Sequence, residues 1–130
     1  MLAPMDTSRR SSPHVAVVDD DADVRDAMHA LLRSYGWRVS LYDGAQQLLA
    51  TGLAGVDCVL SDVQMPVMGG LELLGRLRAD PGSPPCILMT AFPDDQVRKR
   101  ALAAGAVCFL SKPVDDEILA ECLSSAVGTA

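Results

Sequence analysis

The sequence predicts an α/β fold in which parallel strands alternate with helices. Five short apolar runs, rich in β-branched residues, are separated by longer segments whose apolar residues recur at helical spacing. Because parallel neighbours need a crossover of about a dozen residues, this alternation predicts one sheet with helices on both faces. A chain of 130 residues, 49% of them apolar, is long enough for one such domain with its own core.

The five apolar runs are the predicted strands. They cover residues 14–18, 38–42, 58–60, 86–90 and 106–110. Runs that are apolar at nearly every position are typical of parallel strands buried on both faces. The cysteines stand singly, without the C-x-x-C spacing of zinc and redox sites, so we expect them to be buried and reduced. They are Cys58, Cys86, Cys108 and Cys122.

The predicted helices carry local start and stop signals. Asp21 and Asp23 cap the first, which ends at Gly36, and Asp43 caps the second. The third ends at residues 80–82, Asp94 caps the fourth, and the fifth begins at about Asp115. The apolar residues expected to face the core are Val24, Ala27, Met28, Leu31, Leu32, Tyr35, Leu48, Leu49, Leu71, Leu74, Leu77, Val97, Ala101, Ala104, Ile118, Leu119, Cys122, Leu123 and Ala126.

The two ends of the chain differ from the rest. Residues 1–13 are polar and contain Pro4 and Pro13, which predicts a flexible arm. The domain itself is expected over residues 14–127, and residues 128–130 form a short tail.

Charge and hydropathy exclude several classes of protein. The net charge is −6, and it becomes −7 without the arm, which argues against direct nucleic-acid binding by this domain. No apolar stretch approaches the roughly 18–20 residues that span a bilayer, and the N-terminal arginines are not followed by the apolar segment of a signal peptide. We therefore expect a cytoplasmic protein without a membrane partner.

Polar side chains follow the predicted strands where each strand ends. Asp19, Asp20 and Asp21 come after the first strand, Ser61 and Asp62 after the third, Thr90 at the end of the fourth, and Ser111 and Lys112 after the fifth. The carboxyl ends of parallel strands meet at one edge, where ligands bind. Each residue alone is explained by helix capping or a turn. Their joint occurrence favours a functional site.

This combination suits phosphoryl chemistry. Clustered carboxylates repel one another unless a cation neutralises them, and Mg²⁺ prefers oxygen ligands of this kind. A carboxylate can also act as a nucleophile and form an acyl phosphate. A hydroxyl and an ammonium group can then hold the phosphoryl oxygens during transfer.

Four motifs carry a resemblance to a known family. They are VVDD at 17–20 followed by Arg25, DVQMPVMGG at 62–70, TA at 90–91 and FLSKP at 109–113. With these motifs in this order, residues 14–127 resemble the receiver domain of bacterial two-component response regulators. The run MTAFPDDQVRKRALAAGAVCFLSKP is similar to receivers of the nitrogen-fixation regulator type, including short single-domain receivers.

The resemblance implies a flavodoxin-like sheet with five parallel strands in the order 2-1-3-4-5. It also implies that Asp62 accepts the phosphoryl group, that Lys112 pairs with that group, and that the bond before Pro113 is cis. Thr90 and Phe109 would form a conformational switch. The resemblance further implies that Mg²⁺ is the cofactor, bound by Asp19, Asp20, Asp62 and the backbone carbonyl of Gln64.

The implied role is signalling rather than enzymatic turnover. A sensor histidine kinase or a histidine phosphotransfer protein would donate the phosphoryl group. A downstream protein would bind the fourth helix, fifth strand and fifth helix, where Arg98, Lys99 and Arg100 otherwise form a solvated face. The sequence identifies neither the kinase, the stimulus nor the target, and it leaves open a stand-alone receiver, which we favour, or a missing output domain.

Two other functions remain open at this stage. One is a phosphatase of the haloacid dehalogenase type, which needs a second acid two residues after the nucleophile. That position is Gln64, which disfavours the phosphatase. The other is a pseudo-receiver that only docks partners, which is expected to lack Asp62 or Lys112.

Overall fold

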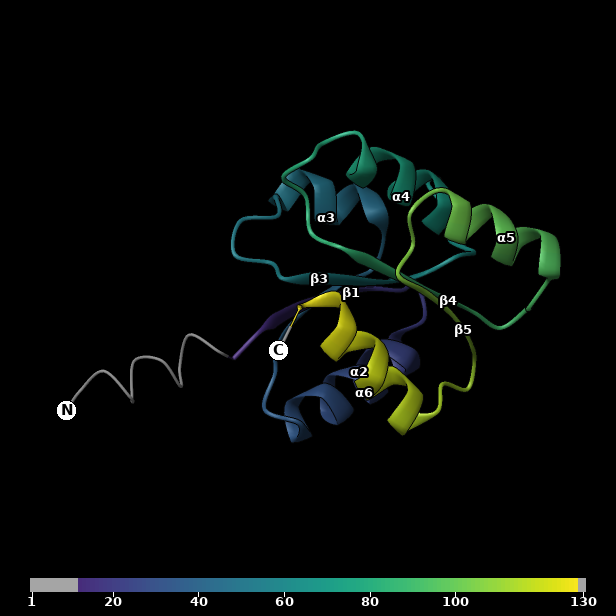
Figure 1. Cartoon of the computed structure of the whole chain (residues 1–130). Coiled ribbons are helices and arrows are strands. Elements are labelled where there is room, and N and C mark those ends of the chain that lie inside the picture. The colour runs from purple at the N-terminus through teal and green to yellow at the C-terminus, as the bar shows by residue number, and fades with distance from the viewer. Residues whose placement is uncertain (1–11, 129–130) are drawn as a thin grey trace.

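Strands and helices alternate throughout residues 12–128, the part of the chain that the computed structural model describes (Figure 1). The strands are β1 (His14–Val18), β2 (Arg38–Tyr42), β3 (Cys58–Asp62), β4 (Cys86–Thr90) and β5 (Cys108–Ser111). The helices are α2 (Ala22–Ser34), α3 (Ala45–Thr51), α4 (Gly70–Arg78), α5 (Asp95–Ala103) and α6 (Asp116–Ala126). The predicted alternation is therefore confirmed.

The strands form one parallel sheet in the order β2-β1-β3-β4-β5. This is the flavodoxin-like order that the resemblance implied. Strands β3 and β4 are buried at every position, as continuous apolar runs in a central parallel strand predict. The carboxyl ends of β1, β3 and β4 therefore lie side by side at one edge.

Helices cover both faces of the sheet (Figure 1). On one face α3, α4 and α5 pack over a core that includes Val59, Leu74 and Leu88. On the other face α2 and α6 pack over a core that includes Leu32, Ile87 and Leu119. Alternate residues of each strand point into the two cores. Packing on both faces of the sheet therefore holds the end of each strand in position.

Two of the predicted helix caps, Asp21 and Asp94, are confirmed. The other two, Asp23 and Asp43, are wrong, and Asp23 lies inside α2, where its N–H donates to the Asp21 side chain. The side chains of Asp21, Asp94 and Asp115 accept hydrogen bonds from the first backbone N–H groups of α2, α5 and α6. Asp43 does not cap α3, because Gly44 occupies the capping position. The Asp43 N–H instead donates to Oε1 of Gln47, at 2.8 Å.

Some predicted boundaries and burials also differ. Strand β3 extends to residue 62, and β5 begins at 108 rather than 106, because the Ala106 N–H still donates to a carbonyl of α5. Ile118, in the first turn of α6, is 49% exposed rather than buried. Three other residues predicted to face the core are exposed, namely Ala27, Tyr35 and Ala104.

The expectation of four reduced, buried cysteines is correct only for Cys58 and Cys86, which are free and fully buried. Cys108 on β5 and Cys122 on α6 form a disulfide. The fold brings these two residues together across 14 positions of sequence, with their Cα atoms 6.3 Å apart. Spacing along the chain gives no sign of this proximity.

The described part of the predicted arm is attached to β2. The Arg38 N–H donates to the Pro13 carbonyl at 2.9 Å, and the Ser12 hydroxyl donates to the Gly36 carbonyl at 3.1 Å. The remainder of the arm, residues 1–11, and the tail residues 129–130 lie outside the described residues. Within residues 12–128, the helices are all too short or too polar to cross a membrane.

Candidate functional site

Three carboxylates meet at the carboxyl edge of the sheet. Asp19 and Asp20 directly follow β1, and Asp62 ends the adjacent strand β3. Each offers one oxygen, and these oxygens lie within 4.8 Å of one another. Asp19 is fully buried and Asp62 nearly so, whereas Asp20 is exposed. The predicted acidic cluster is therefore present, and it opens to solvent through Asp20.

Backbone contacts fix the buried carboxylate of Asp19. Its N–H donates to the Tyr42 carbonyl at 3.1 Å, and its Oδ1 accepts from the Asp21 N–H at 2.9 Å. The Asp19 carbonyl accepts from the guanidinium of Arg25 at 2.7 Å. Arg25 thus supports the loop after β1 through the backbone. The second carboxylate oxygen of Asp19, Oδ2, faces the site.

Lys112 bridges two of the carboxylates. Its Nζ lies 2.8 Å from Oδ2 of Asp19 and 3.1 Å from Oδ1 of Asp62. The backbone holds it in place, because the Lys112 N–H donates to the Thr90 carbonyl at 2.8 Å. The Lys112–Pro113 bond is cis, as the resemblance implied. An ammonium group from the edge strand therefore reaches the centre of the site.

Burial and charge together shift the pKa values of Asp62 and Lys112. Burial raises the pKa of Asp62, the hydrogen bond and charge of Lys112 oppose this, and the charges of Asp19 and Asp20 raise it further. For Lys112, burial acts to lower the pKa, but hydrogen bonds and attraction to Asp19 and Asp62 outweigh it and raise the pKa. Lys112 therefore stays protonated, and it neutralises only part of the negative charge that Asp62 carries when ionised.

The hydroxyl of Thr90 is held by Gln64. Thr90 is the last residue of β4 and is fully buried. Its hydroxyl donates to Oε1 of Gln64 at 2.7 Å and accepts from the Phe92 N–H at 3.0 Å. The ring of Phe92 itself is 71% exposed. The side chain of Gln64, whose backbone carbonyl is a predicted Mg²⁺ ligand, is thus hydrogen-bonded to the predicted switch residue.

The loop after β3 packs tightly against the strand. The Gly70 N–H donates to the Val63 carbonyl at 2.9 Å, and a Cβ at Gly70 would lie 2.4 Å from the Asp62 carbonyl oxygen. Only glycine fits this close approach. Within the loop, Val67 has φ of +70° and is 82% exposed. Such a backbone conformation is rare for a β-branched residue.

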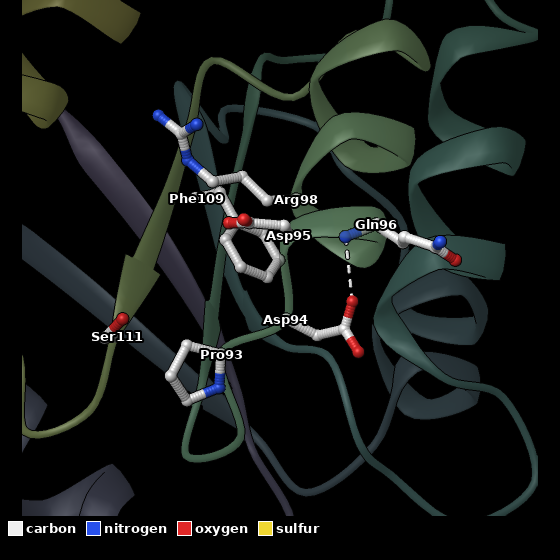
Figure 2. A pocket seen from close by; sticks show the side chains of 7 residues that line it. All are labelled: Pro93, Asp94, Asp95, Gln96, Arg98, Phe109 and Ser111. Atoms are coloured by element: carbon white, nitrogen blue, oxygen red, sulfur yellow. Dashed lines mark hydrogen bonds between the residues drawn. The ribbon is translucent and has the colours of Figure 1, made fainter.

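Phe109 lies on the α5 side of β5 and is half-buried. It lines a surface pocket of about 470 Å³ with Ser111 and residues from the start of α5. Figure 2 shows its ring beside Asp95 and Arg98, with Pro93 below. The predicted switch aromatic therefore lies away from the carboxylate cluster, at the junction of β5 and α5.

Comparison with known sequences decides the family. The sequence model of the response regulator receiver domain matches residues 15–124. The chain belongs to this family. It is 42% identical over 119 residues to the transcriptional regulatory protein FixJ of Bradyrhizobium diazoefficiens, covering 90% of this chain and 58% of that protein. This receiver thus spans little more than half the length of that relative.

Solved structures agree with this assignment. The response regulator StyR superposes with a TM-score of 0.82 at 35% identity, over 91% of this receiver and 60% of that chain. Chemotaxis protein CheY4 of Vibrio cholerae gives a TM-score of 0.79 at 27% identity, over 89% of this receiver and 99% of that chain. Both likenesses extend over nearly all of the described residues.

The receiver fold brings most of the predicted site residues together. Asp19, Asp20, Asp62 and Lys112 form one cluster, and Thr90 and Gln64 form a hydrogen-bonded pair. Phe109 lines a pocket that none of these six residues lines. The Gln64–Thr90 pair was missed, because the position of Gln64 in the motif at 62–70 does not indicate where its side chain points.

Proposed function

We propose that Asp62 accepts a phosphoryl group and that this receiver works as a phosphorylation switch. One observation carries the proposal: the Asp62 carboxylate lies 3.1 Å from Lys112 and within 4.8 Å of the nearest oxygens of Asp19 and Asp20. In the proposed step a carboxylate oxygen of Asp62 forms a bond to phosphorus while the bond from phosphorus to a donor histidine breaks. Attack of this kind requires Asp62 in its ionised form.

The site also fits Mg²⁺. Three carboxylates with close oxygens are the ligands that this ion prefers, and the raised pKa of Asp62 reflects in part the uncompensated charges of its neighbours. We propose Asp20 and Asp62 as carboxylate ligands, Asp19 as a ligand directly or through water, and Gln64 as a backbone carbonyl ligand. When bound, Mg²⁺ would neutralise charge that develops on the phosphoryl oxygens.

The remaining site residues have roles in holding and sensing the phosphoryl group. Lys112 would donate to one phosphoryl oxygen and Thr90 to another. Thr90 must first release Gln64, because its single proton is already donated there. Its movement would then allow Phe109, now half-buried beside α5, to turn inward. These successive movements would transmit phosphorylation of Asp62 to the surface formed by α5, β5 and α6.

The partners of the switch follow from its chemistry. We propose that a sensor histidine kinase or a histidine phosphotransfer protein supplies the phosphoryl group in the cytoplasm. A downstream protein would bind α5, β5 and α6. We further propose that the receiver occupies residues 14–127, between an arm at 1–13 and a tail at 128–130, and that it catalyses nothing beyond its own phosphorylation and dephosphorylation.

The two alternative functions are less well supported. A phosphatase of the haloacid dehalogenase type needs a general acid two residues after the nucleophile. That residue is Gln64, whose amide accepts a hydrogen bond from Thr90 and has no proton to give as an acid. A docking-only receiver would not need Lys112 bridging Asp19 and Asp62.

Phosphorylation with a small donor tests the proposal. Acetyl phosphate with Mg²⁺ should add one phosphoryl group, detected by intact mass and removed by hydroxylamine, as an acyl phosphate requires. The Asp62→Asn variant should gain none while it keeps its fold by circular dichroism. Asp26→Asn, on an exposed carboxylate of α2, is the matched control and should label normally. Labelling of Asp62→Asn would exclude Asp62 as the acceptor.

A further inference from the structure

The disulfide between Cys108 and Cys122 closes a ring around functional residues of the receiver. Cys108 is the first residue of β5, and Cys122 lies in α6. The ring of residues 108–122 contains Phe109 and Lys112. Strand β5 is an edge strand that pairs only with β4, and the disulfide adds a covalent link from it to α6 on the face of the sheet that α2 and α6 cover.

The other two thiols of the described chain are buried, which disfavours their reactive thiolate form. Cys58 and Cys86 are fully buried, and burial raises the pKa of each thiol to about 12. Since the thiolate is the reactive form, neither exchanges readily with a soluble disulfide. Cys108 differs because it is only partly buried, and it is therefore the cysteine that we expect a reagent to reach. Cys122 is 9% exposed and lies behind it.

We propose that Cys108 and Cys122 form a reversible thiol–disulfide site whose oxidant is a small disulfide of the glutathione type. The Cys108 thiolate attacks the small disulfide, forms a mixed disulfide and releases one thiol. The Cys122 thiolate then displaces the second thiol and closes the ring. The two protein sulfurs lose two electrons in total, and the small disulfide gains two electrons and two protons.

The Cα–Cα distance of 6.3 Å lies within the usual range for a disulfide, about 4.4–6.8 Å. Neither β5 nor α6 therefore needs to move far for the bond to form. Disulfides that form in reducing compartments are mostly transient and serve sensing or catalysis, which fits a site with one accessible sulfur and one screened one.

The position of the ring predicts its effect on signalling, and this part rests on the proposed function. Cys108 faces the core under α2 and α6, whereas its neighbour Phe109 faces α5. A cross-link on one face of β5 restricts movement of the aromatic residue on the other. In the structure the link coexists with Thr90 bound to Gln64, which is the resting arrangement. Oxidation should therefore favour the resting state.

Thiol trapping in glutathione buffers tests the site itself. The protein is equilibrated at graded ratios of reduced to oxidised glutathione and then alkylated under denaturing conditions. Intact mass spectrometry counts the alkylated thiols. As the ratio of reduced to oxidised glutathione falls, two of the four thiols should become protected from alkylation. When the ratio rises again, these two thiols should become reactive again. Cys108→Ser should protect none, because the accessible thiol is gone. Cys122→Ser should stop at the mixed disulfide of Cys108, with one thiol blocked and the mass of one glutathione added. The control Cys58→Ala should still protect two. Four reactive thiols at every ratio, or a bond that excess reduced glutathione never opens, would overturn the proposal.

The cross-link should also stabilise the fold. Closing a ring of this size predicts a melting temperature about 10 °C higher in the oxidised protein. Cys108→Ser should show the same melting temperature in both buffers. Neither this measurement nor thiol trapping needs Mg²⁺ or Asp62, so their failure is distinct from a failure of the proposed phosphorylation.

Reciprocal coupling tests the effect on the switch. Beryllofluoride, which mimics an acyl phosphate, should bind the oxidised protein about fivefold more weakly than the reduced protein or worse. By linkage it should shift the half-oxidation point toward the dithiol by the same factor. In Asp62→Asn the ring should still close, but beryllofluoride should shift nothing. Equal affinity of the oxidised and reduced forms would overturn the coupling.

Discussion

The hydrogen bond between Thr90 and Gln64 predicts how firmly the resting state is held. A threonine hydroxyl has one proton, so Thr90 cannot donate to Gln64 and to a phosphoryl oxygen together. Replacing Gln64 with methionine keeps the length of the side chain and the backbone carbonyl but removes the amide oxygen. We therefore expect Gln64→Met to favour the phosphorylated arrangement.

The size of this effect follows from the contact. The oxygen–oxygen distance is 2.7 Å and both groups are uncharged, so the bond contributes about 0.5–1.5 kcal/mol. In the proposed switch the bond exists only in the resting state, so only that state loses it. A loss of about 1 kcal/mol lowers the free energy of unfolding of the resting protein by that amount and raises beryllofluoride affinity about fivefold.

Calorimetric titration of beryllofluoride in saturating Mg²⁺ measures this change. The matched background is Thr90→Val, which keeps the shape of the side chain but has no hydroxyl. In that background Gln64→Met should change neither the affinity nor the free energy of unfolding, since the bond is already absent. Unchanged or weaker binding by Gln64→Met alone, or the same gain in the Thr90→Val background, would refute the reasoning.

Two further predictions concern the acidic cluster. Mg²⁺ at ten times its dissociation constant should stabilise the fold by about 1.4 kcal/mol, which a higher melting temperature would show. Asp20→Ala should remove most of this stabilisation. A melting-temperature shift that persists in Asp20→Ala would exclude Asp20 as a ligand. The pKa of Asp62 is raised, so between its ordinary and raised values the folded state binds more protons than the unfolded state. The free energy of unfolding without metal should therefore fall as pH rises through that interval. Urea titrations across pH should show this fall in the wild type and a flatter profile in Asp62→Asn, and identical profiles would contradict it.

The strands could be predicted well because their composition leaves few alternatives. Residues 14–18, 38–42 and 86–90 have the predicted bounds. For 14–18 and 86–90 this follows because apolar runs buried on both faces suit a central parallel strand, whereas 38–42 is a partly exposed edge strand. The caps at Asp21 and Asp94 could also be predicted from a local signal, since each aspartate precedes a run of residues at helical spacing. At Asp43 the local signal failed because the adjacent Gly44 takes the capping position.

Side-chain contacts between distant segments could not be predicted in this way. The topology alone places Asp19, Asp20 and Asp62 at one edge, and that much follows from the sequence. The Gln64–Thr90 bond depends on the rotamer of an exposed side chain, and the disulfide depends on how α6 lies against β5. The backbone of Val67, with φ of +70°, is likewise imposed by the tight loop between β3 and Gly70 and not by the preference of valine.

The charges of the site support the proposal that it uses both a lysine and a divalent cation. Ionised Asp19, Asp20 and Asp62 with Lys112 leave two negative charges uncompensated, which one Mg²⁺ would balance. Phosphorylation removes the charge of the Asp62 carboxylate but adds about two on the phosphoryl group, so the balance becomes negative again. Lys112 now divides its hydrogen bonds between Asp19 and Asp62, and the new phosphoryl oxygens offer it a stronger partner than the carboxylate oxygen they replace. Phosphorylation should therefore draw Lys112, and with it the end of β5, toward Asp62.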